Sequence, residues 1–309
     1  MTSASEVFIG VDGGGTKTIV VAVDANGKEL ARHTASTSNP AVIGFENCVE
    51  VLSTSIRAVA TKSGANLPLA GGWLGLSGFD RPGDRERIAP GLRDFVLNPY
   101  LSNDGELVLA ELPDRIGVAV ISGTGSIAIG RNAADERARA GGWGHIFGDE
   151  GSGWALGKEA LRAISQQIDG RGKDTNLTSL VMTEWELDDP TQIVTRAYAP
   201  ETKKRDIAKL SSLTIRAAWY GDEVANQIIA AESEKLASQV IAVANRLGFK
   251  DEIPLAMSGG LLLHVLSYRT ALRKAIERHR NLSTFALVLD PALSAAQAIA
   301  LEASEKGRL

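Results

Sequence analysis

The sequence predicts an α/β protein with two domains of similar topology, and three features carry this prediction. The chain has 309 residues, which suits one large domain or two medium ones. Runs of β-branched residues alternate with apolar residues at helical spacing. A strand–glycine turn–strand pattern occurs twice, at residues 7–23 and 116–130.

Composition narrows the class of protein. The sequence is 44% hydrophobic and 23% charged with a formal net charge of −4, which predicts a substantial core and neither disorder nor a nucleic-acid surface. Its single cysteine, Cys48, excludes a disulfide framework or a cysteine metal cluster within one chain. No apolar run approaches the roughly 18 residues that a membrane span needs, and the first residues do not resemble a signal peptide. We therefore expect a cytoplasmic protein without nucleic-acid or membrane partners.

The first domain is predicted to begin with an antiparallel meander and to continue with alternating helices and strands. Residues 7–11, 19–23 and 29–35 are the strands of the meander. The later elements are a helix over 45–62, a buried strand over 69–76, a short amphipathic helix over 84–95 and another short helix over 106–112.

The second domain is predicted to repeat this beginning. Apolar strands over 116–121 and 127–130 flank a second glycine turn, and residues 158–246 are mostly helical. Strands over 253–257 and 285–289 follow, then an alanine-rich closing helix over 291–305. The expected domains are 1–115 plus 291–309, and 116–290, joined by a hinge because no low-complexity linker occurs.

The first glycine turn, DGGGTKT, predicts a phosphate site. Glycines let backbone N–H groups approach a ligand closely, and hydroxyl and ammonium groups add further donors. Asp12 would repel a bare phosphate, so its presence indicates a divalent metal, bound through water. The alternative is a tight hairpin whose glycines supply positive φ. The candidate phosphate residues here are Gly13, Gly14, Gly15, Thr16, Lys17 and Thr18.

The second turn, SGTGS, strengthens this prediction. It carries no charge and follows a buried strand, as the first turn does. Two such loops could hold a nucleoside triphosphate from both sides of a cleft. The P-loop pattern GxxxxGK[ST] does not occur, and no GxGxxG turn opens a helix after the first strand. The candidate residues are Gly123, Thr124, Gly125 and Ser126.

Three motifs in order along the chain resemble those of a known superfamily. DGGGTKT, SGTGS and MSGGLL are similar to the two phosphate motifs and the adenosine motif of the actin-like ATPases and sugar kinases. GGWGHIFGDEGSGWALG, residues 141–157, resembles the signature of the N-acetylglucosamine kinase branch, shared with the BadF/BadG-type ATPases. The resemblance implies two ribonuclease-H-like domains around a central cleft, ATP and Mg²⁺ as cofactors, an amino-sugar substrate and a homodimer. It also implies an adenosine contact at Gly259 and Gly260, which would otherwise form a strand-to-helix turn.

A sugar kinase needs a base that accepts the hydroxyl proton. Asp104, in SND, follows a short extended segment just before the second domain, where the resembling kinases carry their catalytic aspartate. The alternative for Asp104 is a helix N-cap, and the two roles are compatible. Gly105 and Glu106 depart from the small apolar residues expected after the base.

The resemblance also implies the sugar contacts. Asn39 lies in the polar loop STSNP, where the alternative is a turn before Pro40, and an amide can both donate to and accept from hydroxyls. Asp80 and Asp84 are predicted to be surface charges, and His145, Trp143 and Trp154 to be packing residues. The candidate sugar-binding residues are Asn39, Ser77, Gly78, Asp104, Gly141, Gly142, Asp149 and Glu150.

The predicted function is transfer of the γ-phosphate of ATP to a hydroxyl, the 6-hydroxyl, of an amino sugar. N-acetylglucosamine or glucosamine is expected first. Ile127 stands where some N-acetylglucosamine kinases carry a polar residue, so N-acetylmuramic acid or another hexose derivative stays open.

Two other functions remain as alternatives. One is a BadF/BadG-type ATPase, although Cys48 alone cannot supply a four-thiolate iron–sulfur cluster shared by two subunits. The other is a non-catalytic nucleotide or sugar sensor, which would not need a base at Asp104.

Overall fold

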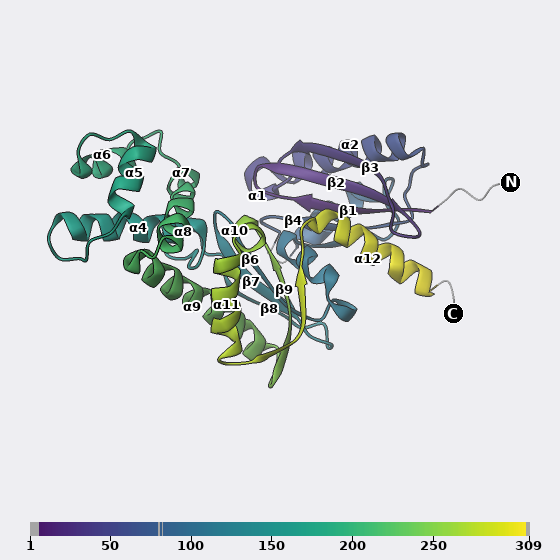
Figure 1. The fold of residues 1–309 in the computed structure, drawn as a ribbon. Coiled ribbons are helices and arrows are strands. Elements are labelled where there is room, and N and C mark those ends of the chain that lie inside the picture. Colours follow the sequence, from purple (N-terminus) through teal and green to yellow (C-terminus); the bar gives the residue numbers. More distant parts are fainter. Residues whose placement is uncertain (1–5, 80, 82, 307–309) are drawn as a thin grey trace. The chain divides into compact units, whose positions relative to one another are not determined.

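The computed structural model describes residues 6–79, 81 and 83–306, which form two compact units (Figure 1). The first unit draws on Met1–Arg115 and Val288–Leu309, and the second on Ile116–Leu287. The closing helix α12 (Pro291–Lys306) thus belongs to the unit that begins the chain.

Each unit contains a five-stranded sheet, and the two sheets have the same topology. The first has the order β3-β2-β1-β4-β5 and the second β10-β9-β6-β7-β8. In each, the first three strands form an antiparallel meander, and the last two extend the sheet in parallel on the other side of the first strand. The strands are β1 (Val7–Gly13), β2 (Lys17–Asp24), β3 (Glu29–Ser36), β4 (Gly71–Leu76), β5 (Tyr100–Asn103), β6 (Gly117–Ser122), β7 (Ser126–Arg131), β8 (Arg137–Gly141), β9 (Glu252–Ser258) and β10 (Asn281–Leu287). The predicted similarity of the two halves is confirmed.

Helices cover both faces of the first sheet. Phe8 of β1 packs against α12, whereas the next residue, Ile9, packs with the apolar face of α2 (Phe45–Ser63), because side chains alternate between the faces of a strand. A Cβ on Gly10 would lie 1.8 Å from the Ala292 carbonyl oxygen, so glycine lets α12 approach β1 closely. The remaining helices of this unit are α1 (Pro40–Ile43), α3 (Asp84–Ile88) and the 3₁₀ helices Ala89–Leu92, Asp104–Glu111 and Pro113–Arg115.

The second unit has two cores. One lies between its sheet and the helices α9 (Glu223–Arg246) and α11 (Leu266–Glu277). The other lies within a helical group around the N-terminal end of α9 and includes Ala225 of that helix (Figure 1). The remaining helices are α4 (Gly153–Ile168), α5 (Leu177–Trp185), the 3₁₀ helix Pro190–Gln192, α6 (Ile193–Ala197), α7 (Lys204–Lys209), α8 (Ser211–Trp219) and α10 (Gly260–His264).

Three predictions of local structure need correction. The helix predicted over 84–95 ends at Ile88 and continues as a 3₁₀ turn containing Pro90, which lacks the N–H of an α-helical bond. The short helix predicted over 106–112 is the 3₁₀ helix Asp104–Glu111. The last strand is Asn281–Leu287 rather than 285–289, and β8 was not predicted. Both strands lie at sheet edges, where polar residues replace the continuous apolar signal. Among the described residues, no helix has the length and apolar character of a membrane span.

Candidate functional site

The carboxyl ends of three parallel strands align along one edge of the first sheet. Gly13 of β1 pairs with Leu76 of β4, and Leu76 pairs with Asn103 of β5. Ligands of α/β proteins bind outside the carboxyl ends of such strands. Three predicted segments follow directly at this edge: the glycine turn 14–16, the pair Ser77 and Gly78, and Asp104.

In the first glycine turn, other atoms of the protein leave space beside the backbone of Gly15. The Gly14 N–H donates to the Lys17 carbonyl at 3.0 Å, and Thr37 Oγ1 donates to the Gly14 carbonyl at 2.9 Å. A Cβ on Gly15 would meet no atom within 4 Å, and φ is not positive at Gly14 or Gly15. The hairpin alternative, in which glycine is needed for positive φ, therefore fails here. Neither packing nor backbone conformation requires glycine at Gly15, and both Thr16 and Lys17 are exposed beside it.

Two of the predicted phosphate residues hold the turn in place instead. Thr18 is fully buried, and its hydroxyl lies 2.7 Å from the Ser36 carbonyl and 2.9 Å from Ser38 Oγ. A Cβ on Gly13 would lie 2.4 Å from Ser38 Oγ, so this glycine admits the neighbouring loop. Gly13 and Thr18 thus make contacts inside the fold, and the surface of the turn that a ligand can reach is formed by residues 14–17.

Asp12, at the end of β1, has an environment that favours a cation. Burial raises the pKa of the Asp12 carboxyl, the Lys17 ammonium opposes this shift, and the Asp290 carboxylate adds to it. Asp290 itself pairs with Arg32 at 2.6 Å. No group of three or more His, Cys, Asp or Glu side chains suited to a metal occurs within the described ranges. A Mg²⁺ ion held at Asp12 would thus take its other ligands from water and phosphate, which is its usual preference.

Asp104 stands at the start of the 3₁₀ helix after β5. The capping side chain is that of Asn103, whose Oδ1 accepts from the Gly105 N–H at 3.0 Å, and Asp104 Oδ1 accepts from the same N–H at 3.0 Å. A Cβ on Gly75 would lie 2.9 Å from Asp104 Cα, so glycine in β4 brings Asp104 close to the neighbouring strand. Asp104 is half-buried at the edge where β1 and β4 also end.

The structure brings together two predicted sugar residues of the first unit. Asn39 caps α1, with its Oδ1 accepting from the Ala41 N–H at 2.8 Å. Gly78 has φ +76°, and a Cβ there would lie 2.6 Å from Asn39 Oδ1. The amide nitrogen of Asn39 has no hydrogen-bond partner in the part of the chain that the structure describes, which leaves a donor for a ligand.

One predicted surface charge is instead structural. Asp84 is only 4% exposed, and its Oδ2 accepts from the Arg81 N–H at 3.0 Å. The prediction for Asp84 was therefore wrong, because its carboxylate organises the loop after β4. Asp80 lies outside the described residues.

In the second unit, the second glycine turn is joined to residues 149–154 of the signature segment. The five hydrogen bonds are Ser122 Oγ to the Gly151 carbonyl (2.8 Å), Ser126 Oγ to the Glu150 carbonyl (2.7 Å), the Ser126 N–H to Asp149 Oδ1 (3.2 Å), the Gly153 N–H to the Gly123 carbonyl (2.8 Å) and the Trp154 N–H to the Thr124 carbonyl (3.3 Å). Two separate sequence motifs thus fold as one site. Gly123 resembles Gly15, because its φ is not positive and the nearest atom to an added Cβ is 3.8 Å away.

The third motif lies beside the second turn. Ile121 of β6 pairs with Ser258 of β9, so both strands end at the same edge. Gly259 has φ +92°, and a Cβ there would lie 2.4 Å from the Ser122 carbonyl oxygen. Gly259 is thus required for the strand-to-helix turn itself, whereas Gly260 is exposed with little around it.

Asp149 is buried, and its backbone is left-handed. It adopts φ +62°, and it is 3% exposed. Its Oδ1 accepts from Ser126, and its Oδ2 forms no hydrogen bond among the described residues but lies 2.6 Å from the Lys204 ammonium. Aspartate adopts this left-handed conformation more readily than most residues, so the burial and the ion pair distinguish Asp149 more than its φ does. Lys204 was not predicted, because KKR at 203–205 resembles an ordinary solvated charge run.

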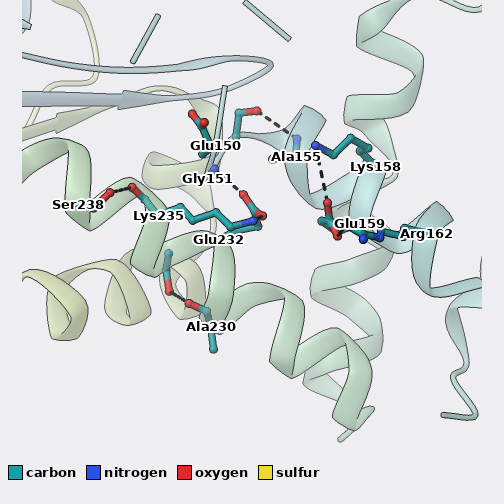
Figure 2. Close-up of polar contacts among 12 residues, drawn as sticks. Glu150, Gly151, Ala155, Lys158, Glu159, Arg162, Ala230, Glu232, Lys235 and Ser238 are labelled. Carbon is teal, nitrogen blue, oxygen red and sulfur yellow. Dashed lines mark hydrogen bonds and ion pairs between the residues drawn. The ribbon is translucent and has the colours of Figure 1, made fainter. Parts of the chain in front are cut away.

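The second unit has a surface pocket of about 660 Å³, whose lining includes Gly141, Glu150 and Gln239. The Gln239 amide donates to Glu150 Oε2 at 3.1 Å, and Gly141 has φ +75° with an added Cβ only 2.3 Å from Gln239 Oε1. Gly142 also has positive φ and packs on Ile127. Figure 2 shows Glu150 beside the Gly151 N–H, which donates to the buried Glu232.

The aromatic residues of the signature segment differ from the prediction. Trp143 is 60% exposed rather than packed, and the nearby Ile146 and Phe147 are also exposed. His145 meets the edge of Trp154 with ring centres 4.9 Å apart, but His145 itself is exposed. Only Trp154, which is half-buried, fits a packing role.

Comparisons with known proteins show to which family the chain is related. The model of the BadF/BadG/BcrA/BcrD ATPase family matches residues 9–297. An N-acetyl-D-glucosamine kinase of Dictyostelium discoideum is 32% identical over 95% of this chain and 97% of its own length. An N-acetylmuramic acid/N-acetylglucosamine kinase of Clostridium acetobutylicum is 32% identical over 83% of this chain and 86% of its own.

A solved structure shows the same fold. A candidate N-acetylglucosamine kinase from Chromobacterium violaceum superposes with a TM-score of 0.67 at 25% identity, over 96% of this chain and 99% of that one. This likeness confirms the predicted fold class, two ribonuclease-H-like domains of the actin-like type. With a family model that matches almost the whole length, the chain belongs to the BadF/BadG/BcrA/BcrD ATPase family.

Proposed function

We propose that this protein is an ATP-dependent kinase that transfers the γ-phosphate to a hydroxyl, the 6-hydroxyl, of an amino sugar, with N-acetylglucosamine as the first candidate. The observation that carries the proposal is the pair Gly15 and Gly123. Each follows a parallel strand at its carboxyl end, and neither packing nor positive φ accounts for glycine there. Close approach of a phosphate to the backbone does account for it. The two curated relatives, whose names specify N-acetylglucosamine, support the substrate class.

The residues at the carboxyl ends of the strands in the first sheet have separate proposed roles. Asp104 accepts the proton of the sugar hydroxyl, so that the oxygen can attack the γ-phosphorus. Asn39, Ser77 and Gly78 bind the sugar hydroxyls. Asp12 holds Mg²⁺ through water, and this ion neutralises charge on the phosphate oxygens when bound.

The residues of the second unit complete the substrate contacts. The N–H groups of Thr124 and Gly125 and the Thr124 hydroxyl donate to phosphate oxygens, and Gly123 lets the phosphate approach the backbone. Ser126 supports the turn through its bonds to Asp149 and Glu150, and residues 259–260 contact the adenosine. Gly141, Gly142 and Glu150 contact the sugar, whereas Asp149, whose carboxylate is buried between Ser126 and Lys204, supports this segment from inside the fold. Support for this assignment comes from the hydrogen bonds that hold the signature segment against the second turn.

A coupled ADP-release assay tests the proposal. Wild type with ATP and Mg²⁺ is compared over N-acetylglucosamine, glucosamine, N-acetylmuramic acid, N-acetylmannosamine and glucose. We expect strong stimulation by one amino sugar. ATP binding without stimulation by any sugar would instead support an ATPase or a sensor.

Two further properties follow from the family resemblance and stay predictions. We expect a homodimer, which light scattering of the purified chain tests. We expect the protein in the cytoplasm, which cell fractionation tests.

A further inference from the structure

We infer that Lys204 binds the polyphosphate of the nucleotide at the second glycine turn. This inference rests on the proposed function and adds a residue that the sequence motifs do not contain. The turn, residues 122–126, carries no charged side chain of its own. The proposed Mg²⁺ and Lys17 belong to the first turn, so within the second unit only backbone and hydroxyl donors of the turn would face the phosphates unless another segment supplies a cation.

Lys204 lies where such a cation is needed. Its Nζ is 2.6 Å from Asp149 Oδ2 and 3.0 Å from the position that a Cβ on Gly125 would occupy. The same Cβ would lie 2.7 Å from Asp149 Oδ1, so glycine at this position makes room for both members of the ion pair directly against the turn.

The ion pair is oriented with its positive end toward solvent. The Asp149 side chain is 5% exposed, whereas that of Lys204 is 31% exposed. Asp149 also accepts from the Ser126 N–H, so the carboxylate is fixed from two sides. An ammonium has three N–H donors, and within the described ranges its ion-pair partner is Asp149. The remaining donors can bind phosphate oxygens without breaking the pair.

Close backbone packing fixes the position of Lys204. A Cβ on Gly157 of α4 would lie 2.0 Å from the Ile207 carbonyl oxygen of α7, and one on Gly153 would lie 3.2 Å from the Ala208 carbonyl oxygen. These glycines let the helix that carries Lys204 lie against the helix that follows Asp149. Because Asp149 holds the ammonium as well, Lys204 loses less freedom when it binds an anion than an unpaired lysine would.

Two other roles for Lys204 predict different results. Lys204 could act only as the partner that neutralises buried Asp149, since removing one member of a buried pair is costly. It could instead bind a carboxylate on the sugar, such as the lactyl group of N-acetylmuramic acid. The neighbouring Arg205 is exposed and serves as a matched control for loss of one positive charge.

Isothermal titration of ATP and of adenosine, with Mg²⁺ and without sugar, separates these roles. The proteins are wild type, Lys204→Met, Arg205→Met and the double variant Asp149→Asn with Lys204→Met. We expect Lys204→Met to weaken ATP binding by about tenfold or more, as for loss of a charged hydrogen bond. We expect adenosine binding, and ATP binding by Arg205→Met, to change by less than about twofold. The double variant removes both charges, so it folds without an unpaired carboxylate, and it should bind ATP as weakly as Lys204→Met.

Several outcomes would overturn the inference. Recovery of ATP affinity in the double variant would show a purely structural role. An equal loss of ATP and adenosine binding would place Lys204 away from the phosphates. Unchanged ATP affinity with a raised KM for N-acetylmuramic acid would assign Lys204 to the sugar. If wild type phosphorylates a sugar while Lys204→Met binds ATP normally, only this inference fails, whereas failure of wild type to bind ATP removes the proposed function as well.

Discussion

Glu232 of α9 accepts a 2.8 Å hydrogen bond from the backbone N–H of Gly151, 81 residues earlier in the chain. Glu232 is only 2% exposed, and Gly151 has φ +75°. The Gly151 carbonyl accepts from Ser122 Oγ and from the Tyr268 hydroxyl, both at 2.8 Å. The Gly151 residue thus ties the signature segment to the second glycine turn, to α9 and to α11.

Glu232→Ala should destabilise this arrangement. The variant leaves the buried Gly151 N–H without an acceptor, which costs about 1–3 kcal/mol in the free energy of unfolding. Glu232→Gln keeps an acceptor oxygen and should recover part of the loss. Urea unfolding measures the effect, with the exposed Glu234→Ala on the same helix as control. Equal stability of Glu232→Ala and Glu234→Ala would contradict the role of this bond.

Gly15→Ala should separate folding from nucleotide binding. An added methyl group meets no atom within 4 Å, so the free energy of unfolding should stay within about 0.5 kcal/mol of wild type. ATP affinity should fall, because the methyl group occupies the space that the phosphate uses. Gly10→Ala is the contrasting variant, since its methyl group would lie 1.8 Å from the Ala292 carbonyl oxygen and should destabilise the first unit. Titration of Gly15→Ala with ATP decides the point, and wild-type affinity would count against the proposed phosphate contact.

Asp12→Asn should weaken the use of Mg²⁺ and ATP but stabilise the fold at neutral pH. Burial raises the folded-state pKa of Asp12 above its ordinary value of 3.8. The stability that protonated Asp12 contributes is fully present below pH 3.8 and is lost as pH rises through the folded-state pKa. Asparagine stays neutral, so the variant should melt above wild type at neutral pH and approach it near pH 4. Melting curves over this range, with Mg²⁺ titrations of activity, test both parts. A variant that melts below wild type at neutral pH, or that keeps the wild-type Mg²⁺ dependence, would contradict this account.

Asp104→Asn should lower kcat by about 10²-fold or more, the usual contribution of a general base. ATP affinity should stay close to that of wild type, because the proposed role concerns the sugar hydroxyl. Asp94→Asn, at an exposed carboxylate of the same unit, controls for loss of a negative charge. Turnover near the wild-type rate in Asp104→Asn would remove Asp104 from the role of base.

Much of the fold could be predicted from the sequence, because its main signals are local. The strands β1 and β6 are largely apolar and lead into glycine turns, and α2 has one apolar face that α-helical spacing reveals. β8 was missed because arginines alternate with small residues in an edge strand, where burial does not demand an apolar run. The 3₁₀ helices are equally hard to predict, since their short turns carry no periodicity.

The candidate site could be predicted less completely, because it depends on contacts between distant segments. Gly15 and Gly123 lie within recognisable turns, and the structure adds that no internal contact explains them. Thr18 belongs to the first motif, but its hydroxyl contacts Ser36 and Ser38 inside the fold. The sequence does not show that these two serines lie beside it. Lys204 reaches the second turn from α7, and no spacing in the sequence links it to Asp149.

The central claim is tested most directly by identifying which molecule receives the γ-phosphate. The protein is incubated with ATP, Mg²⁺ and N-acetylglucosamine labelled with ¹³C at C6, and the products are analysed by ³¹P and ¹³C NMR. Our account predicts a phosphate ester with ³¹P–¹³C coupling at C6 for wild type and almost none for Asp104→Asn. Release of inorganic phosphate alone, with the sugar unchanged, would contradict the assignment of this protein as an amino-sugar kinase.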